Sequence, residues 1–406
     1  MGIIVQKFGG TSVASPKVRD LVVEKVRKAR EQGASPVVVV SAMGRRGECY
    51  ATDTLIDLAR SANPSIASRE MDHIMYCGEM ISAVIMAGTL QAHGMDAVML
   101  TGGQAGVITD DNFNNARILR VEPARLLSLL KAGKVPVVCG FQGISEDHEL
   151  TTLGRGGSDT SAAALGAALD ADMVEIYTDV DGIMTADPRI VCNAKILDQI
   201  SYGEVCQLAH QGAKVIHPRA VEIVMTKNIP LVVKSTFSDA PGTLITNVAQ
   251  PDSGGRPVTD RIATGVASIG KIAQIKVSLP ENAPGNASFS IFKAMADNQI
   301  SVDLINVHPG QVMFTVAEEV VGKAACKIGE LGYEASSTLD CAKVSVVGGG
   351  INGVPGVMAN FIQALAKYEI AILQTVDSHT SISVLVKNED VQKAVTSLHE
   401  TFNLAE

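Results

Sequence analysis

The sequence predicts an α/β protein: a mainly parallel sheet between helices, followed by two copies of a smaller α+β module. Two observations lead to this prediction. Short runs of β-branched residues alternate with longer helical stretches as far as residue 245, which is the order expected of a layered α/β fold. Beyond residue 261 the chain repeats itself, which indicates a duplicated unit.

Six apolar runs have the length of buried strands, and they cover residues 3–8, 37–41, 97–101, 135–141, 174–178 and 229–234. The stretches around them predict helices over 17–31, 53–60, 68–93, 123–132 and 160–169. Open parallel sheets bind ligands at the carboxyl ends of their strands. We therefore expect a binding site in the loops that follow the strands.

The stretch TNVAQPDSGGRPVTDR at 246–261 is rich in Pro, Gly and polar residues, a composition typical of a linker. After it, Pro284-Gly285 precedes IFKAMADNQISVDL and Pro355-Gly356 precedes FIQALAKYEIAIL, with the two copies roughly 70 residues apart. The predicted divisions are an α/β domain at 1–245, the linker, and modules at 262–337 and 338–406. A duplication kept only for its structure is the alternative interpretation of the repeat.

Composition narrows the class of protein. The formal net charge is −9, aromatic residues make up 4% of the chain and Trp is absent, which argues against a nucleic-acid or anionic-membrane partner. The seven cysteines form no CxxC and no zinc-finger spacing with His, so neither a structural metal nor a disulfide framework is predicted. The start, MGIIVQKFGG, does not resemble a signal peptide. We expect a cytoplasmic protein.

Three glycine clusters follow predicted strands or open a predicted helix. They are KFGGTS at 7–12, SAMG at 41–44 and GRGGSD at 154–159. Glycine lets backbone N–H groups approach an anion, and a helix N-terminus favours negative charge. The clusters together predict a phosphate site, although the sequence contains neither the GxxxxGK[ST] of P-loop proteins nor a strand-linked dinucleotide fingerprint.

Several charged residues accompany the glycines. Glu79 lies within an apolar helix, where a carboxylate needs a partner or a site. Arg155 stands between glycines and either binds a carboxylate with both of its arms or faces solvent. Asp159 opens a predicted helix, where it is an N-cap, a partner that holds Lys7, or both.

Polar residues further along the chain have two interpretations each. These residues are Thr178, Asp179, Asp187, Arg189 and Lys214. They either form the rim of a nucleotide site or are ordinary turn and surface residues. We assign no chemistry to His217, His308 or His379.

The motifs KFGGTS, SAMG, GRGGSD and TDVDGIMTADPR, the last at 178–189, occur in the order seen in the aspartate kinase family. The resemblance covers the whole chain: residues 1 to 245 resemble the amino-acid kinase domain, and the repeats resemble paired ACT regulatory modules of βαββαβ order. It implies the short, monofunctional form, which transfers a phosphoryl group from ATP to the β-carboxylate of L-aspartate. That reaction opens the biosynthesis of lysine, diaminopimelate, threonine and methionine.

The resemblance also implies roles for individual residues. The catalytic residues would be Lys7, Asp159 and Lys214. The ATP site would contain Lys7, Phe8, Gly9, Gly10, Thr178, Asp179, Met184, Asp187, Arg189 and Lys214. Aspartate would be held by Ser41, Thr52, Glu79, Arg155, Gly156, Gly157 and Ser158, with its α-carboxylate on Arg155 and its α-ammonium on Glu79.

The chemistry of the residues agrees with this assignment. The β-carboxylate of aspartate is ionised at pH 7, so no general base is required. The reaction needs neutralisation and alignment of two anions, which the lysines, the glycine amides and Mg²⁺ would supply, with the metal carried by ATP and not by a protein ligand set. Two features depart from some relatives: Met184 stands in place of Tyr, and residues 45–51 lengthen the loop before Thr52.

Regulation is a further implication of the resemblance. An end-product amino acid such as lysine, threonine or meso-diaminopimelate would bind between paired modules, and strand edges of the modules would join a homodimer or larger assembly. The candidate effector residues are Asn282, Ala283, Pro284, Gly285, Asp303, Asn306, Gln374 and Asp377.

Two other functions remain open at this point. One keeps the fold but changes the acceptor to glutamate, acetylglutamate, carbamate or UMP. The other is an amino-acid sensor without catalysis. Arg155 together with Glu79 favours a free amino acid as acceptor, and the presence of Lys7, Asp179 and Lys214 argues against a sensor.

Overall fold

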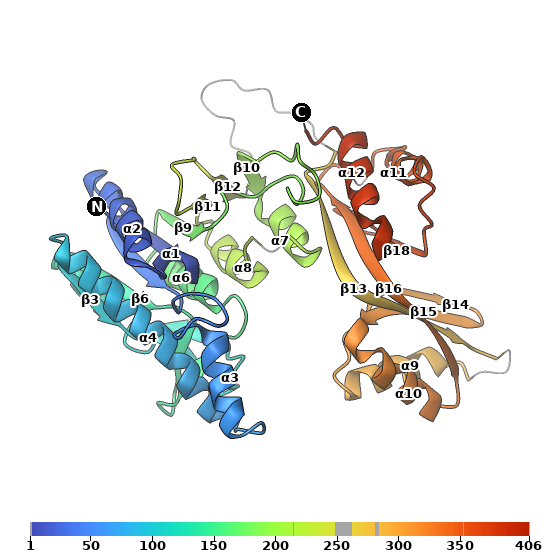
Figure 1. Ribbon diagram of the computed structural model, residues 1–406, viewed down its shortest axis with the longest axis horizontal. Helices are drawn as coiled ribbons and strands as arrows, with labels where there is room; N and C mark the ends of the chain where they lie inside the picture. The colour runs from blue at the N-terminus through green and yellow to red at the C-terminus, as the bar shows by residue number, and fades with distance from the viewer. Residues whose placement is uncertain (1, 214, 248–261, 281–283, 352, 406) are drawn as a thin grey trace. The chain divides into compact units, whose positions relative to one another are not determined.

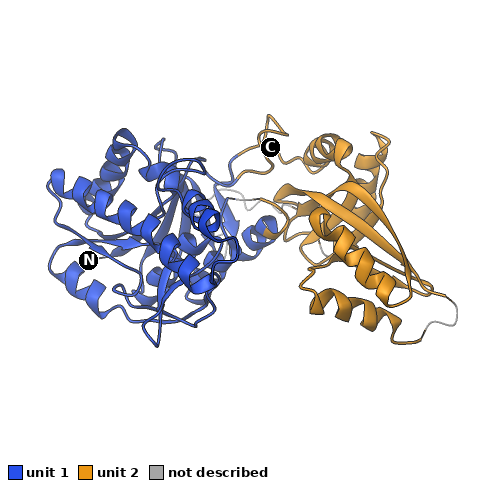
Figure 2. Ribbon diagram, turned by 60° about the horizontal axis from the view of Figure 1, so that its bottom comes forward, with its two compact units in different colours: residues 1–183, 196–209, 214–256 blue, residues 184–195, 210–213, 257–406 orange. Residues whose placement is uncertain are grey.

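The computed structural model describes residues 2–213, 215–247, 262–280, 284–351 and 353–405. The chain forms two compact units. Unit 1 comprises residues 1–183, 196–209 and 214–256, and unit 2 comprises residues 184–195, 210–213 and 257–406 (Figure 2). Apart from its first two residues, the predicted linker at 246–261 lies outside the described residues.

Unit 1 is built on an eight-stranded sheet with the order β10-β12-β11-β9-β1-β2-β6-β3. The central strands are parallel: β1 pairs with β2 on one side and with β9 on the other. Most of their residues are apolar and buried because helices cover both faces. The bounds are β1 Ile3–Phe8, β2 Ser35–Val40, β3 Ala97–Leu100, β6 Val135–Cys139, β9 Met173–Thr178, β10 Gln199–Ser201, β11 Leu231–Ser235 and β12 Thr243–Thr246.

Helices enclose this sheet (Figure 1). Helices α2 and α4 pack their apolar stripes on β2 and β6 in one core cluster. On β1 and β9 lies α6, so close that a Cβ at Gly166 would meet Val174 Cγ2 at 2.4 Å. The bounds are α1 Gly10–Val13, α2 Pro16–Glu31, α3 Thr52–Ala62, α4 Ser68–Ala92, α5 Ala124–Lys131, α6 Gly157–Ala168, α7 Tyr202–His210 and α8 Pro218–Thr226.

The α4 helix is the one span among the described residues that is long and apolar enough to cross a membrane by length and composition. Buried core helices pass the same test, and 50% of its apolar window is buried inside the structure. It also carries two buried carboxylates, Asp72 and Glu79. We therefore interpret α4 as a core helix of unit 1.

A second, four-stranded sheet of order β5-β4-β7-β8 completes unit 1. Its strands are β4 Val107–Thr109, β5 Ile118–Val121, β7 Gln142–Ser145 and β8 Leu150–Thr152. The sequence did not predict these strands because three or four residues are too few to show a period. The six predicted strands and five predicted helices are confirmed to within three residues at each end.

Unit 2 contains a six-stranded antiparallel sheet of order β14-β15-β13-β16-β18-β17. Its two central strands, β13 Gly265–Ser278 and β16 Glu334–Val347, have 14 residues each, and Figure 1 shows them running side by side. The other strands are β14 Asp303–His308, β15 Gln311–Ala317, β17 Gln374–Asp377 and β18 Ser381–Lys387, and the helices are α9 Ala287–Asp297, α10 Val321–Glu330, α11 Val357–Ala366 and α12 Val391–Thr401.

Two apolar cores lie along these long strands. The module 1 core is formed by residues between Ala273 and Ala335, under α9 and α10. The module 2 core is formed by Ala263, Val266 and residues between Val344 and Leu404, under α11 and α12. The module 2 core also contains Ala186 and Val191, which come from a segment far earlier in the chain. Each long strand therefore contributes to both cores.

Candidate active site

The first two glycine clusters meet at the carboxyl edge of the large sheet. They follow β1 and β2, which are parallel neighbours. Gly44 N donates to Gly10 O at 3.1 Å, and a Cβ at Gly10 would meet Ala42 O at 2.6 Å. A side chain at residue 10 would therefore push the two loops apart, which is the physical reason for glycine there.

The third cluster joins the first through an ion pair. Lys7 Nζ lies 2.6 Å from Asp159 Oδ1, and the two side chains are only 12% and 13% exposed. The N-cap of α6 is Gly156, with φ of 68°, so Asp159 lies in the first turn and the N-cap interpretation is wrong. The alternative, that Asp159 holds Lys7, describes the observed contact.

A cavity of 770 Å³ opens beside this pair. It is lined by Lys7, Asp159 and all seven residues predicted to hold aspartate: Ser41, Thr52, Glu79, Arg155, Gly156, Gly157 and Ser158. The sequence analysis did not identify further polar residues of its wall, which are Arg46, Asp53, Arg60 and Asn114. The sequence pattern does not distinguish these four residues, because each lies in a loop or on a helix with other exposed polar residues.

Glu79 is the most unusual group in the cavity wall. Its side chain is 2% exposed, and its Oε1 accepts a hydrogen bond of 3.1 Å from the Ala42 N–H. Its Oε2 has no hydrogen-bond partner among the described residues. Burial raises the pKa of Glu79 to about 8, because a charged carboxylate without a cation is costly in a dry site. The site is suited to a ligand that brings a positive charge.

Arg155 lies in the same wall and is exposed. No hydrogen bond or ion pair engages its guanidinium among the described residues, so its donors face the cavity or solvent. Its neighbour Gly156 packs against His217, whose Cγ lies 2.2 Å from the position of an added Cβ. His217, to which we assigned no chemistry, is the N-cap of α8 and helps to fix this loop.

The predicted nucleotide residues are distributed over both units. Thr178 and Asp179 lie in unit 1, and Asp179 pairs with Arg45 at 2.7 Å between two exposed side chains. Met184, Asp187 and Arg189 belong to unit 2. Asp187 pairs with Arg189 at 2.6 Å, and hydrogen bonding to that guanidinium lowers the pKa of the carboxyl. Lys214 lies outside the described residues.

The side chain of Phe8 does not face the loops. It is fully buried and stacks on Tyr177 with ring centroids 4.7 Å apart, so it supports the sheet from within. Its carbonyl accepts a hydrogen bond from Ser41 N at 3.1 Å. Any role of Phe8 at the loops is therefore a role of its backbone.

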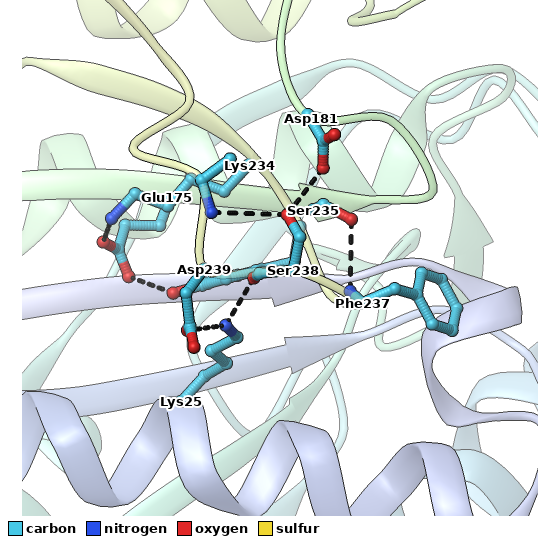
Figure 3. A network of polar contacts seen from close by, with 10 residues as sticks. Lys25, Glu175, Asp181, Lys234, Ser235, Phe237, Ser238 and Asp239 are labelled. Carbon is cyan, nitrogen blue, oxygen red and sulfur yellow. Dashed lines mark hydrogen bonds and ion pairs between the residues drawn. The ribbon is translucent and has the colours of Figure 1, made fainter.

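A polar network braces the loop that follows β9 (Figure 3). Lys25 Nζ donates to Ser238 O and to Asp239 Oδ1, each at 2.7 Å. Ser238 Oγ in turn donates to Asp181 Oδ1 at 2.6 Å, two residues beyond Asp179. The network ties helix α2 and the loop after β11 to the stretch that contains Thr178 and Asp179.

The continuation of that stretch, residues 184–195, belongs to unit 2. Ala186 and Val191 lie in the module 2 core. Thr185 is hydrogen-bonded through its Oγ1 to His399 Nε2 at 2.9 Å, and its carbonyl accepts from Val266 N at 2.8 Å. The segment that carries Met184, Asp187 and Arg189 is thus packed on the second module.

Three of the predicted effector residues lie on the outer strands of the unit 2 sheet, Asp303 and Asn306 on β14 and Gln374 on β17. Gln374 Oε1 accepts from Gln274 Nε2 at 2.9 Å, and Gln374 Nε2 donates to Leu304 O and to Asn306 Oδ1. Asp303 pairs with Lys343.

The remaining effector candidates lie elsewhere. Pro284 and Gly285 form an exposed turn before α9, and Asp377 ends β17. No hydrogen bond or ion pair of the described residues joins these three to the cluster around Gln374. Asn282 and Ala283 lie outside the described residues.

The described residues contain no group of three or more His, Cys, Asp or Glu side chains that could hold a metal ion. The seven cysteines are free thiols.

The fold and the cavity define a kinase-type catalytic unit joined to regulatory modules, and comparisons with known proteins agree. Residues 2–235 match the Amino acid kinase family and residues 336–400 match the ACT domain. The chain is 48% identical to Aspartokinase 1 of Bacillus subtilis over 100% of both proteins. It is 42% identical to the aspartokinase of Mycolicibacterium smegmatis, over 100% of this chain and 97% of that one.

Solved structures give the same result. The chain superposes on Escherichia coli aspartokinase III in complex with aspartate and ADP with a TM-score of 0.81, at 25% identity, covering 98% of this chain and 99% of the other. It superposes on the same enzyme in complex with lysine and aspartate with a TM-score of 0.78, over 100% of both chains and again at 25% identity. The chain belongs to the aspartokinase family.

Proposed function

We propose that this protein transfers the γ-phosphoryl group of ATP to the β-carboxylate of L-aspartate, giving ADP and 4-phospho-L-aspartate. One observation carries the proposal: a single cavity of unit 1 contains the Lys7–Asp159 pair together with a buried carboxylate oxygen and a guanidinium that have no partner among the described residues. These are the groups required by an α-ammonium, an α-carboxylate and a phosphoryl group. Membership of the aspartokinase family supports the same reaction.

Aspartate binds, in this proposal, with its ammonium on Glu79 and its α-carboxylate on Arg155. The free Oε2 of Glu79 accepts from the ammonium, whose charge stabilises the ionised carboxylate in its buried site. Arg155 presents a fork of donors that matches a carboxylate. Ser41, Thr52, Ser158 and the amides of Gly156 and Gly157 complete the wall around the acceptor.

Phosphoryl transfer then requires charge neutralisation more than proton transfer. Lys7 reaches the phosphates from the end of β1, beside the amides of Gly9 and Gly10, and Asp159 holds its ammonium group in place. Asp159 is therefore a positioning residue for Lys7, and Lys214 adds a second cation. The acceptor carboxylate attacks without a general base because it is already ionised.

Mg²⁺ enters with the nucleotide in this proposal. The nearby carboxylates are already paired, Asp159 with Lys7 and Asp179 with Arg45, which fits a metal held mainly by phosphate oxygens. The bound ion supplies charge compensation between the phosphates. Thr178, Asp179, Met184, Asp187 and Arg189 provide the remaining nucleotide contacts.

Regulation completes the proposal. An end-product amino acid binds unit 2, with the polar cluster of Asp303, Asn306 and Gln374 as its candidate site, and shifts the protein to a state that binds substrates poorly. Lysine, threonine and meso-diaminopimelate are the candidate effectors. The outer strands β14 and β17 of the unit 2 sheet are candidates for pairing with a second copy in a homo-oligomer. The protein acts in the cytoplasm, where it opens the biosynthesis of these amino acids.

The test is ADP release from Mg–ATP together with trapping of the acyl phosphate by hydroxylamine. We expect aspartohydroxamate with L-aspartate and none with L-glutamate. Succinate, which lacks the α-ammonium, and β-alanine, which lacks the α-carboxylate, report on Glu79 and Arg155 separately. ATP binding without any hydroxamate from aspartate contradicts the proposed reaction. The same assay with each candidate effector identifies the regulator.

A further inference from the structure

Helix α4 carries a second buried carboxylate, two turns before Glu79 and on the same side of the helix. Asp72 is 0% exposed. It forms no ion pair among the described residues, and four hydrogen bonds satisfy its two oxygens. Asn114 N lies 3.1 Å from both oxygens, Thr152 N donates to Oδ2 at 3.0 Å, and Thr152 Oγ1 donates to Oδ1 at 2.6 Å.

These bonds connect three segments that are distant in sequence. Asn114 lies in the loop between β4 and β5, and Thr152 is the last residue of β8. The loop and the strand are also joined directly, because Ala116 N donates to Thr152 O at 2.9 Å. A Cβ at Gly154 would lie 2.7 Å from Asn115 Oδ1. Asp72 therefore fixes to α4 the base from which the Gly154-Arg155 turn departs.

The two walls of the cavity meet at this carboxylate. Met71, Met75 and Glu79 line the cavity from α4, while Asn114, Gly154 and Arg155 line it from the loops. A carboxylate buried at this position is costly unless its hydrogen bonds are complete. The four hydrogen bonds of Asp72 satisfy this requirement at the place where the two walls adjoin. An apolar residue would pack there without fixing either loop.

We propose that Asp72 is a positioning residue that sets the separation of Arg155 from Glu79, and so makes the site selective for an acceptor that carries both α-groups. The inference rests on the proposed function, in which Glu79 binds the α-ammonium and Arg155 the α-carboxylate. Asp72 does not touch the substrate. It acts by holding the arginine turn at a fixed distance from the helix that carries the glutamate.

The first test is Asp72→Asn, which keeps the shape but replaces one acceptor oxygen by a donor that faces N–H groups. We expect KM for L-aspartate to rise about tenfold or more, because a misplacement of about 1 Å is costly for a bound reactant, while KM for ATP stays within twofold. The preference for L-aspartate over β-alanine, measured as the ratio of kcat/KM values, should fall about tenfold because the arginine contact is weakened.

Matched variants separate positioning from general support of the fold. Ser82→Ala removes another buried polar group from the same helix, a hydroxyl without a hydrogen-bond partner among the described residues, and should change neither KM nor the preference. Thr152→Val removes one of the four bonds to Asp72 and should give an intermediate loss of preference. Thr152→Ser keeps the hydroxyl and should therefore keep the wild-type preference for L-aspartate.

The outcomes distinguish this inference from the proposed function. Wild-type protein that forms no aspartohydroxamate contradicts the proposed function itself. Wild-type activity together with unchanged aspartate KM and unchanged preference in Asp72→Asn overturns the positioning role, whatever happens to its melting temperature. Should Asp72→Asn fail to fold, unchanged preference in Thr152→Val overturns it equally.

Discussion

The aspartate side and the nucleotide side of the candidate site are built differently. All the predicted aspartate residues lie in unit 1, around one cavity whose central carboxylate is 2% exposed. The predicted nucleotide residues divide between the two units, and their charged members form exposed pairs, Arg45 with Asp179 and Asp187 with Arg189. The predicted aspartate residues share one cavity of unit 1, whereas the predicted nucleotide residues come from segments assigned to different units.

The two modules of unit 2 differ in their contacts with the segment at residues 184–195. The segment with Met184, Asp187 and Arg189 packs its Ala186 and Val191 into the module 2 core, whereas the module 1 core contains only residues of the repeats. The two copies of the module are therefore not equivalent. We expect changes in module 2 to alter the use of ATP, and changes in module 1 to leave the catalytic segment in place.

The largest effect is expected from Glu79→Gln, which tests the aspartate side alone. Loss of a charged hydrogen bond to the ammonium should lower kcat/KM for aspartate about a hundredfold, since such a bond is worth up to about 3 kcal/mol. KM for ATP should not change. Steady-state kinetics with each substrate varied provides the measurement, and Glu70→Gln on the exposed start of the same helix is the control. Equal losses for both substrates would contradict the division into two sides.

The pH dependence of kcat/KM for aspartate is a second test of the role of Glu79. Burial raises the pKa of Glu79 to about 8, and only the ionised form accepts from an ammonium. Below pH 8, kcat/KM for aspartate should therefore rise up to tenfold per pH unit and level off above it. Glu79→Gln should lack this slope, and kcat/KM for ATP measured at saturating aspartate should not follow it. A wild-type profile without any slope between pH 6 and 8 would contradict the role of Glu79.

Stability of the free protein should show the opposite trend. A carboxyl whose folded pKa is raised stabilises the protein fully below its unfolded value of 4.5, and that contribution is lost as the pH rises toward 8. The melting temperature of Glu79→Gln should therefore fall less than that of the wild type between pH 6 and 8. Saturating aspartate should remove this difference by stabilising the ionised form.

The nucleotide side is tested by a matched pair of core substitutions. Val191→Ala in the module 2 core and Val316→Ala in the module 1 core both truncate a buried valine and should each cost roughly 1–3 kcal/mol of folding free energy. Val191→Ala should also raise KM for ATP about threefold to tenfold, because a loosened segment binds nucleotide less well. Val316→Ala should not, and neither should alter KM for aspartate. An equal rise in KM for ATP in Val191→Ala and Val316→Ala would mean that both modules support the nucleotide side to the same extent.

The Thr185–His399 contact predicts a smaller effect that depends on pH. Burial lowers the pKa of His399, and the nearby Glu400 opposes this shift. Because protonation of His399 then favours unfolding, its contribution to the free energy of unfolding is present above about pH 6.5. Below that pH the contribution declines, by up to about 1.4 kcal/mol per pH unit. Calorimetry of wild type and His399→Gln between pH 7.5 and 5.5 should show a steeper decline in wild type. His93→Gln, at the exposed end of α4, is the control.

The sequence predicted the local features of the candidate site, the strand ends and glycine turns, but not the contacts between distant segments, for a physical reason. Strand ends and glycine turns are local features, so KFGGTS, SAMG and GRGGSD were recognisable in the sequence, and residues of all three motifs line one cavity. Asp72 gave the same signal as Glu79, a charge within an apolar helix. It was missed because its partners, the backbone N–H groups of Asn114 and Thr152 and the Thr152 hydroxyl, lie far away in the sequence.

No local sequence pattern predicted that residues 184–195 would contribute to the module 2 core. Ala186 and Val191 stand in a loop without helical or strand periodicity, and their burial depends on residues beyond 340. The four-stranded sheet was missed for a related reason, since strands of three or four residues depend on their neighbours for stability more than on their own sequence. Contacts across long sequence separations decided both features.

The smallest effect is expected from Arg189→Ala. The guanidinium is 88% exposed and pairs with Asp187 on the surface, so its loss should leave the folding free energy nearly unchanged. KM for ATP should rise about twofold at low salt and converge with wild type at high salt, because an exposed charge is screened. KM for aspartate should stay constant, as it should in Arg120→Ala, a surface pair of unit 1. A loss above tenfold that resists salt would mean that Arg189 is enclosed when nucleotide binds, and the nucleotide side would then be as preorganised in the complex as the aspartate side is without ligand.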